Sequence, residues 1–343
     1  MEQIWKVAVY SATTHPLIKH FPKQIPKWGN CEFILNSGSE DCDCLFVIDS
    51  ILGDIPVKCG KENTFLCICE PASVKLYSSK YINQFGNIVS FRNFSRYKGN
   101  TISSFPLLPW MVGSKFDFDL KAWDKDNFLD YDTLQQRVTC DKKNKVAVIT
   151  SNKTLTRGHR QRLDFILKLK SIIPDLLDIY GEGFDFVIDK YDIYSKYKYV
   201  LAFENCREKG YWTEKIADAY LCEAFPFYWG APDLSNYFSE AAYEEIDMSS
   251  VDFAAQKMKQ YIKSNYYKNK LPMILEEKKK ILNNYNPFIR ISQILENRIV
   301  ESKSADYCLF QEKKTWIHKI RQLYYRTIKS VSYTHLRAHE TRS

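Results

Sequence analysis

Short apolar runs separated by polar stretches recur along the first third of the chain. Each run has the length of a β-strand, and most of the polar stretches between them are long enough for a crossover helix. The runs lie at residues 6–10, 31–35, 44–48, 64–69 and 88–91. Because strands joined by such crossovers pair in parallel, this pattern predicts an α/β unit with a parallel sheet.

A second series of apolar runs follows a polar stretch at residues 117–144, which we interpret as the last helix and linker of the first unit. The predicted strands of this series lie at residues 145–150, 177–180, 199–203, 225–229 and 243–247, with a helix from about 157 to 170 and closing helices over 251–300. A chain of 343 residues exceeds what one hydrophobic core usually supports. We therefore predict an N-terminal domain over residues 1–140 and a C-terminal domain over residues 141–300.

Residues 198–232 combine strand, polar loop, helix, strand and turn in one uninterrupted unit. The apolar strand at 199–203 ends abruptly at the polar residues Glu204 and Asn205, and Thr213 offers a side-chain oxygen to cap the helix that follows. Ligands of open α/β sheets bind at the carboxyl ends of the strands, so we expect the chemistry of the protein here.

Lys215 would lie in the first turn of that helix, where the helix dipole favours anions over cations. A bound phosphate between its ammonium group and the helix amides would remove this conflict. The alternative is a solvated surface pair of Glu214 with Lys215, and spacing alone does not choose between the two.

Three motifs in this region resemble the signature of one enzyme family. They are residues 203–205 (FEN), 211–215 (YWTEK) and 228–232 (YWGAP), in that order. Together they resemble the α-1,3-fucosyltransferases of glycosyltransferase family 10, and YWG is closer to the bacterial branch. The likeness is strong over 198–232 and looser over 7–299. Cys206 and Trp212 depart from the residues expected, which affects the shape of the sugar pocket.

The resemblance implies a GT-B-type α/β fold, with two Rossmann-like domains facing across a cleft. It implies a transferase that moves L-fucose from GDP-fucose to a hydroxyl of a GlcNAc- or Glc-containing acceptor glycan, most often in α-1,3 linkage and with inversion. The same scaffold using another GDP-sugar, or a non-catalytic protein that binds nucleotides or glycans, is the alternative. The presence of the family's acidic and basic site residues together favours the enzyme.

The resemblance also implies the donor site in the C-terminal domain. Arg160 matches the arginine that contacts the pyrophosphate better than Arg157 or Arg162, and Glu214 would accept hydrogen bonds from the ribose hydroxyls. The remaining implied donor-binding residues are Lys215, Tyr211, Asn205, Ser151 and Asn152.

Glu70 is the candidate catalytic base. It directly follows the apolar run at 64–69 and precedes Pro71, which places a carboxylate at the carboxyl end of a predicted parallel strand. On its own this pattern also fits an ordinary surface acid at a turn. In order and spacing Glu70 matches the catalytic glutamate of the family, which would deprotonate the acceptor hydroxyl.

Metal binding and disulfides are not favoured by the sequence. The Asp-x-Asp patterns that begin at Asp41, Asp117 and Asp130 recur easily by chance in a chain with many acidic residues, and a cation needs several placed oxygen ligands. The ten cysteines include no Cys-x-x-Cys pair, so reduced thiols are expected rather than zinc or disulfides. We predict no metal site and no obligatory cofactor. GDP-fucose is a substrate, and a divalent cation would at most stimulate.

Charge is concentrated near the end of the chain. The net charge is +8, and residues 311–330, with six basic residues and Glu312, carry +5 of it. A nearly neutral remainder argues against a nucleic-acid surface. We predict that residues 301–330 form a basic amphipathic C-terminal helix, of which residues 312–329 lie on an anionic membrane. The alternative is a helix docked on the other domain.

The ends of the chain predict its location. Residues 1–11 lack the apolar core of a signal peptide, and no apolar stretch approaches the length of a membrane span, so we expect a cytoplasmic protein, peripheral on the inner membrane face. Residues 331–343 resemble the translation of a sequencing-library adapter, and we expect them to be an artefact. The partners implied are a GDP-sugar donor and an oligosaccharide acceptor. The acceptor's identity and the oligomeric state have no sequence signal.

Overall fold

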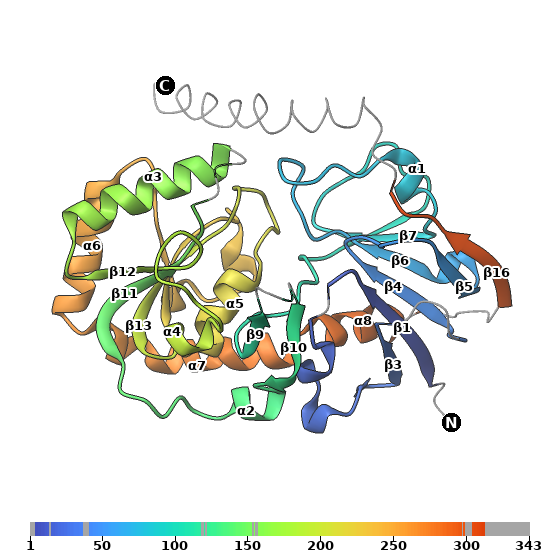
Figure 1. Cartoon of the computed structure of the whole chain (residues 1–343), viewed down its shortest axis with the longest axis horizontal. Coiled ribbons are helices and arrows are strands. Elements are labelled where there is room, and N and C mark those ends of the chain that lie inside the picture. The colour runs from blue at the N-terminus through green and yellow to red at the C-terminus, as the bar shows by residue number, and fades with distance from the viewer. Residues whose placement is uncertain are drawn as a thin grey trace.

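Two parallel β-sheets, one in each half of the chain, organise the structure (Figure 1). The computed structural model describes residues 4–13, 15–36, 41–117, 120, 122–152, 154, 157–296, 298 and 304–312. The predicted α/β class is confirmed, because each large sheet is built mainly from parallel strands joined through helices or longer loops.

The N-terminal sheet has the strand order β2-β3-β1-β4-β6-β7-β8, and only the β2–β3 pair is antiparallel. Its strands are β1 (Trp5–Ser11), β2 (Lys27–Trp28), β3 (Cys31–Leu35), β4 (Cys44–Ile48), β6 (Thr64–Cys67), β7 (Asn87–Ser90) and β8 (Asn100–Ser103). The central strand β4 is buried along its whole length, which explains its continuous apolar sequence. All five predicted strands are confirmed, although β6 ends two residues early.

The C-terminal sheet has the strand order β12-β11-β13-β14-β15 and is parallel throughout. Its strands are β11 (Lys143–Ile149), β12 (Leu177–Tyr180), β13 (Tyr197–Phe203), β14 (Phe225–Trp229) and β15 (Glu244–Glu245). The helices are α3 (Arg157–Ile172), α4 (Tyr191–Tyr194), α5 (Glu214–Leu221), α6 (Val251–Lys263) and α7 (Tyr266–Asn283). Helix α5 packs against β13 and β14, so its N-terminus lies at the edge where those strands end.

The polar stretch at 117–144 differs from its prediction as a helix and linker. It contributes to an antiparallel hairpin of β9 (Ser114–Asp117) and β10 (Ala122–Phe128), followed by the single-turn helix α2 (Tyr131–Gln135). The rings of Phe116 and Trp123 pack across the hairpin at 5.0 Å. This cross-strand pair stabilises a hairpin that the polar composition conceals.

The chain returns to the N-terminal domain after α7. Helix α8 (Pro287–Glu296) packs there through Phe288, whose ring lies 4.3 Å from that of Phe21. Strand β16 (Ser304–Leu309) then pairs antiparallel with β5 (Ile55–Cys59). Residues 304–309, which the sequence placed in a helical segment over 301–330, are thus a strand, because β5 offers them a pairing edge.

Short elements complete the N-terminal domain and the connections. They are α1 (Ser79–Ile82) and the 3₁₀ turns η1 (Leu17–His20), η2 (Pro22–Gln24), η3 (Lys61–Asn63), η4 (Leu234–Asn236) and η5 (Glu240–Ala242). In the part of the chain that the structure describes, no helix has both the length and the apolar character needed to cross a membrane. The predicted helix at 312–329 lies outside the described residues except for Glu312.

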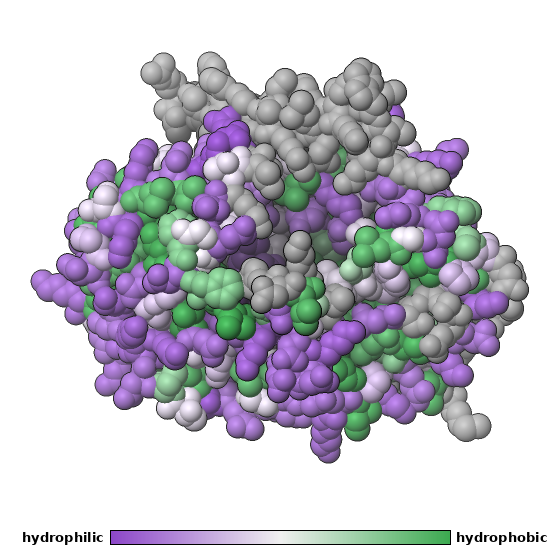
Figure 2. All heavy atoms as spheres, viewed as in Figure 1, coloured by the Kyte–Doolittle hydropathy of each residue, from purple (hydrophilic) through white to green (hydrophobic). Residues whose placement is uncertain are grey.

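Aromatic side chains of the two domains pack against each other. The indole of Trp212 stacks on Phe105 at 4.7 Å, and the ring of Tyr211 lies 5.2 Å from that of Phe91. Figure 2 shows a hollow with hydrophilic side chains near the middle of one face of the molecule. The loop that precedes α5 is therefore packed directly against the N-terminal domain.

Candidate active site

Glu204, at the carboxyl end of β13, is fully buried. Its carboxylate accepts hydrogen bonds from the backbone N–H of Thr213, at 2.8 Å, and from the Thr213 hydroxyl. Thr213 in turn caps α5, accepting the N–H of Lys215 as the sequence predicted. The strand end and the helix start are therefore joined by one buried carboxylate.

Lys215 points back over the start of its own helix. Its Nζ lies 3.2 Å from Oε2 of Glu204 and 3.4 Å from Oε1 of Glu214. Burial alone would lower the pKa of the Lys215 ammonium, but the two carboxylates outweigh it and raise that pKa. Lys215 is therefore a fixed cation beside the helix amides, rather than a solvated surface charge.

Glu214 is held between two lysines. Burial alone would raise its pKa, but Lys215 and Lys190 outweigh that effect and hold the pKa of Glu214 at about 2. Glu204 differs, because burial dominates there and raises its pKa despite Lys215. Of the two, Glu214 is the acid that stays ionised at any working pH, and its oxygens can accept hydrogen bonds.

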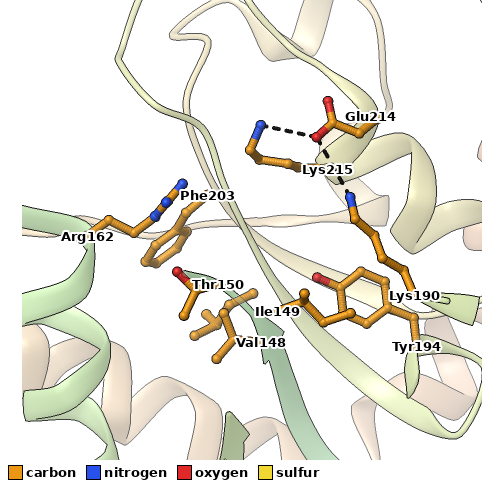
Figure 3. A pocket seen from close by; sticks show the side chains of 10 residues that line it. Val148, Ile149, Thr150, Arg162, Lys190, Tyr194, Phe203, Glu214 and Lys215 are labelled. Carbon is orange, nitrogen blue, oxygen red and sulfur yellow. Dashed lines mark hydrogen bonds and ion pairs between the residues drawn. The ribbon is translucent and has the colours of Figure 1, made fainter. Parts of the chain in front are cut away.

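A pocket opens at the carboxyl ends of β11 and β13, beside α5 (Figure 3). Cationic side chains reach it from three elements or loops: Arg162 from α3, Lys190 from the loop before α4, and Lys215 from α5. Its other lining residues are Val148, Ile149, Thr150, Tyr194, Leu201, Phe203 and Glu214. A concave site with three cations and one ionised carboxylate is suited to an anionic ligand that also carries hydroxyl groups.

Arg162, not Arg160, is the arginine that faces this pocket. Arg162 is 9% exposed and donates from Nη1 to Oδ1 of Asn205 at 3.1 Å, whereas Arg160 is exposed and donates to the carbonyl of Thr154. Two residues of a helix are separated by about 200° of rotation, so the two arginines occupy different faces of α3. The structure therefore does not bring Arg160 together with the other predicted donor-binding residues.

The other predicted donor-binding residues, apart from Glu214 and Lys215, are not among those that line the pocket. Asn205 follows β13, and Tyr211 is buried with its pKa raised well above the usual value by burial and by nearby Glu70. Ser151, the second residue after β11, is partly exposed, and Asn152 is exposed, its N–H donating to the carbonyl of Glu182. Asn205 touches the pocket through Arg162, and Ser151 follows the pocket residue Thr150 in the chain.

Glu70 approaches the same site from the N-terminal domain. It lies three residues beyond β6, and among the described residues its Oε2 is buried without a hydrogen-bond partner. Burial raises its pKa to about 7, with Lys215 opposing the shift and Asp49 adding to it. A carboxylate within electrostatic reach of Lys215, with a pKa near neutrality and a free oxygen, can accept a proton from a bound molecule.

The acidic patterns considered for metal binding have structural partners. Asp43 accepts the N–H of Lys6, and Asp130 caps α2 by accepting the N–H of Thr133. Within the described ranges no group of three or more His, Cys, Asp or Glu side chains is arranged to hold a metal ion. All ten cysteines are free, as the sequence predicted.

Comparison with known families identifies the second domain. Residues 139–275 match the family described as glycosyltransferase family 10 (fucosyltransferase), C-terminal part. These residues are similar to a glycosyltransferase family 10 domain. The match contains the residues of the pocket described above, from Val148 to Lys215. The resemblance seen in the sequence motifs is confirmed.

Proteins similar to the chain include a sequence relative and solved structures. A segment of 74 residues, 21% of the chain, is 38% identical to the α-(1,3)-fucosyltransferase FucT of Helicobacter pylori, of whose length it spans 16%. A crystal structure of an α1,3-fucosyltransferase with GDP-fucose is 19% identical, with a TM-score of 0.46, over 88% of this chain and 94% of that one. A second, with GDP, is 20% identical, with a TM-score of 0.46, over 83% and 92%.

Sequence reasoning gave no role to two residues that line or support the pocket, and it preferred Arg160 to a third, Arg162. Glu204 was noted as a polar residue after a strand and as part of the FEN motif, and Lys190 was not singled out. Arg162 carried a readable signal, because it shares the spacing of the buried residues Phe165, Ile166 and Leu169 on α3. Lys190 has no such signal, since its partners lie far along the chain.

Proposed function

We propose that the protein is an inverting fucosyltransferase. It moves L-fucose from GDP-fucose to a hydroxyl of a GlcNAc- or Glc-containing acceptor glycan, with α-1,3 linkage as the expected product. One observation carries the proposal: Glu70 of the N-terminal domain, a carboxylate with a buried, unpartnered Oε2 among the described residues, lies within electrostatic reach of Lys215, which lines the cationic pocket.

Glu70 is the proposed general base. An acceptor hydroxyl is too weakly acidic to attack unaided, so Glu70 takes its proton as the hydroxyl oxygen bonds to the anomeric carbon of fucose. The bond from that carbon to the β-phosphate oxygen of GDP breaks at the same time, which inverts the anomeric centre. GDP leaves as an anion and needs no proton, so one carboxylate suffices, unlike in glycoside hydrolysis.

Arg162 and Lys215 are proposed to stabilise the negative charge that develops on the leaving GDP. Arg162 can offer a forked donor pair to a phosphate, and its buried Nε has no hydrogen-bond partner among the described residues. Lys215 adds a compact charge at the start of α5, where helix amides also favour an anion. The placement of Arg162 supports it over Arg160 for this role.

Glu214 is the proposed acceptor for the ribose hydroxyls. Its low pKa keeps both oxygens ionised, and its carboxylate lies at the pocket beside Lys215. Tyr211 and Asn205 would add hydrogen bonds near the phosphates, with Ser151 and Asn152 at the edge of the donor site. These assignments follow the family resemblance and rest on the burial and position of each side chain.

A donor and acceptor screen tests the function. GDP-fucose, GDP-mannose and GDP-glucose are each incubated with lactose-type and N-acetyllactosamine-type sugars, and products are identified by mass spectrometry and by NMR of the anomeric proton. We expect an α-1,3-fucosylated product from GDP-fucose alone. Transfer from GDP-mannose or GDP-glucose would show that the donor is not GDP-fucose alone. Nucleotide binding without any transfer, in the presence of a full acceptor panel, would make the protein a binding module.

Cofactor need and location belong to the same proposal. Lysine and arginine side chains supply positive charge at the pocket, so we propose that no metal ion is obligatory. We also propose a cytoplasmic protein that binds the inner membrane face through its basic segment at 312–329.

A further inference from the structure

Lys190 lies in the pocket but has no part in the mechanism above. Its Nζ lies 3.7 Å from Oε1 of Glu214 (Figure 3). The same Nζ lies 2.9 Å from Oδ2 of Asp218, and the side chain of Lys190 is 27% exposed. Burial would lower the pKa of Lys190, but Asp218 and Glu214 outweigh it and raise that pKa. Lys190 is therefore a permanent cation shared between two carboxylates of helix α5.

Asp218 connects this lysine to the N-terminal side of the molecule. It is fully buried, and its second oxygen, Oδ1, accepts the backbone N–H groups of Met111, at 2.9 Å, and Val112, at 3.1 Å. The neighbouring Asp189 accepts the N–H of Gly113 at 2.8 Å. Asp189 thus binds the backbone of the segment 111–113, whereas its neighbour Lys190 binds two carboxylates of α5.

A carboxylate that must accept hydrogen bonds from a ligand works only if its orientation is fixed before the ligand arrives. Glu214 lies in the first turn of α5, and its Oε1 is contacted by Lys215 on one side and Lys190 on the other. Lys215 is itself shared with Glu204, at 3.2 Å. Lys190 connects Glu214 to Asp218, a buried carboxylate whose two oxygens both have hydrogen-bond partners.

We propose that Lys190 is a positioning residue that holds Glu214 in place and links it, through Asp218, to the interdomain segment 111–113. The proposal deepens the donor site and rests on the proposed function for its effect on GDP-fucose. Its structural part, the coupling of Lys190 to Glu214, does not depend on any ligand.

The test is a double-mutant cycle in two readouts. Lys190→Met alone would leave Asp218 as an unpaired buried charge, so Lys190→Met is always made together with Asp218→Asn, whose amide oxygen still accepts the N–H groups of Met111 and Val112. This paired change, Glu214→Gln and their combination are compared with the unsubstituted protein by thermal unfolding without ligand. GDP binding by calorimetry, together with KM and kcat for GDP-fucose, is then measured for the same proteins.

If Lys190 acts through Glu214, the two substitutions are not additive. We expect Lys190→Met to weaken GDP binding and raise the donor KM about tenfold with a smaller change in kcat, as for loss of one charge-assisted contact. In the Glu214→Gln protein the same substitution should change binding less than twofold. Lys190→Arg, which keeps a cation within reach of Glu214, should recover part of the loss.

Additive effects in both readouts would overturn the proposal, and additive loss of GDP binding would indicate that Lys190 contacts the phosphate itself. Lys196→Met is the matched control, because Lys196 is exposed in the same connection, and it should match the parent in every readout. If the unsubstituted protein binds neither GDP nor GDP-fucose, the donor proposal fails. The ligand-free unfolding cycle still decides whether Lys190 holds Glu214.

Discussion

Arg162 of α3 donates a hydrogen bond from Nη1 to Oδ1 of Asn205, the second residue after β13, at 3.1 Å. This contact joins the helix that follows β11 to the loop that follows β13. Because β11 and β13 are neighbouring parallel strands, their carboxyl ends lie together and the two βα connections converge on one pocket. The free donor capacity of the guanidinium is thereby available to an anion in that pocket.

Replacing Arg162 tests which arginine serves the donor. We expect Arg162→Ala to lower kcat/KM for GDP-fucose by roughly 100-fold or more, comparable to losing one placed donor at a developing charge. Arg160→Ala should leave the rate within about threefold, because an exposed charge is screened by solvent. A larger loss of kcat/KM in Arg160→Ala than in Arg162→Ala would instead support Arg160 as the arginine that binds the donor, as the sequence predicted.

Replacing Glu70 tests the general base. Glu70→Gln keeps the size of the side chain but cannot accept the proton, so kcat should fall by about 100-fold or more while GDP binding changes little. Glu62→Gln, at an exposed acid of the same domain, is the control and should behave like the parent. Normal turnover of Glu70→Gln with saturating donor and a confirmed acceptor would transfer the role to another acid of the N-terminal domain.

The pH profile gives a second test of Glu70. Its pKa is raised to about 7 by burial, and only the deprotonated form can act as a base. The value of kcat/KM should therefore rise with pH through about 7 and then level off. In Glu70→Gln this limb should disappear, whereas a limb that persists would belong to another group.

Chelation tests the proposed independence from metal. With Arg162 and Lys215 to neutralise the leaving GDP, transfer should continue after dialysis against EDTA, and added Mg²⁺ or Mn²⁺ should at most raise the rate. Inactivation by EDTA with full recovery on addition of one cation would show that the nucleotide is held through a metal. GDP binding measured in the same buffers separates loss of donor binding from loss of turnover.

Vesicle sedimentation tests the basic segment. A protein ending at Glu312 keeps the hydrogen bond from the N–H of Ser78 to that carboxylate, and it is compared with one ending at Ser330. Only the longer protein should sediment with anionic vesicles, since each basic residue near such a surface contributes on the order of 1 kcal/mol. Neither should sediment with neutral vesicles. Equal sedimentation of both proteins would remove the membrane role.

The parts of the fold that local pattern determines were predictable. Strands β4 and β13 are buried on both faces, so their apolar runs are visible in the sequence, and Thr213 caps α5 through a side chain two residues from its partner. Strand β8 was missed because it is a largely exposed edge strand of polar residues. Strand β16 was missed because only its pairing with the distant β5 makes it a strand.

The site residues also fall into those that local sequence marks and those that only distant contacts bring together. Glu214 and Lys215 are neighbours in one motif, so the sequence could locate them together. Lys190 is brought to them by Asp218, which lies 28 positions away, and nothing local marks that pairing. Whether Arg160 or Arg162 faces the pocket depends on which face of α3 meets the sheet, and Arg162 shares the buried face of Phe165 and Ile166.

The turn after β12 offers a stability test that is independent of function. Gly181 has a φ of +114°, and a Cβ there would lie 2.0 Å from the carbonyl oxygen of Thr150 at the end of β11. This oxygen belongs to backbone that also donates from the Thr150 N–H to Tyr180 at 2.8 Å, so it cannot move without breaking the strand pair. Gly181 is thus required by backbone contact as well as by conformation.

Gly181→Ala should therefore lower the free energy of unfolding by roughly 2–4 kcal/mol, the sum of an unfavourable φ and a backbone clash. Gly53 supplies the matched control, because its φ of +80° is also left-handed in sign but no atom lies within 4 Å of an added Cβ. Gly53→Ala should cost only about 1–2 kcal/mol, the conformational part alone. Urea unfolding of the three proteins measures both. Equal losses at the two positions would mean that the Gly181 turn relaxes away from Thr150, and that the close approach of β11 and β12 beside the pocket is not rigid.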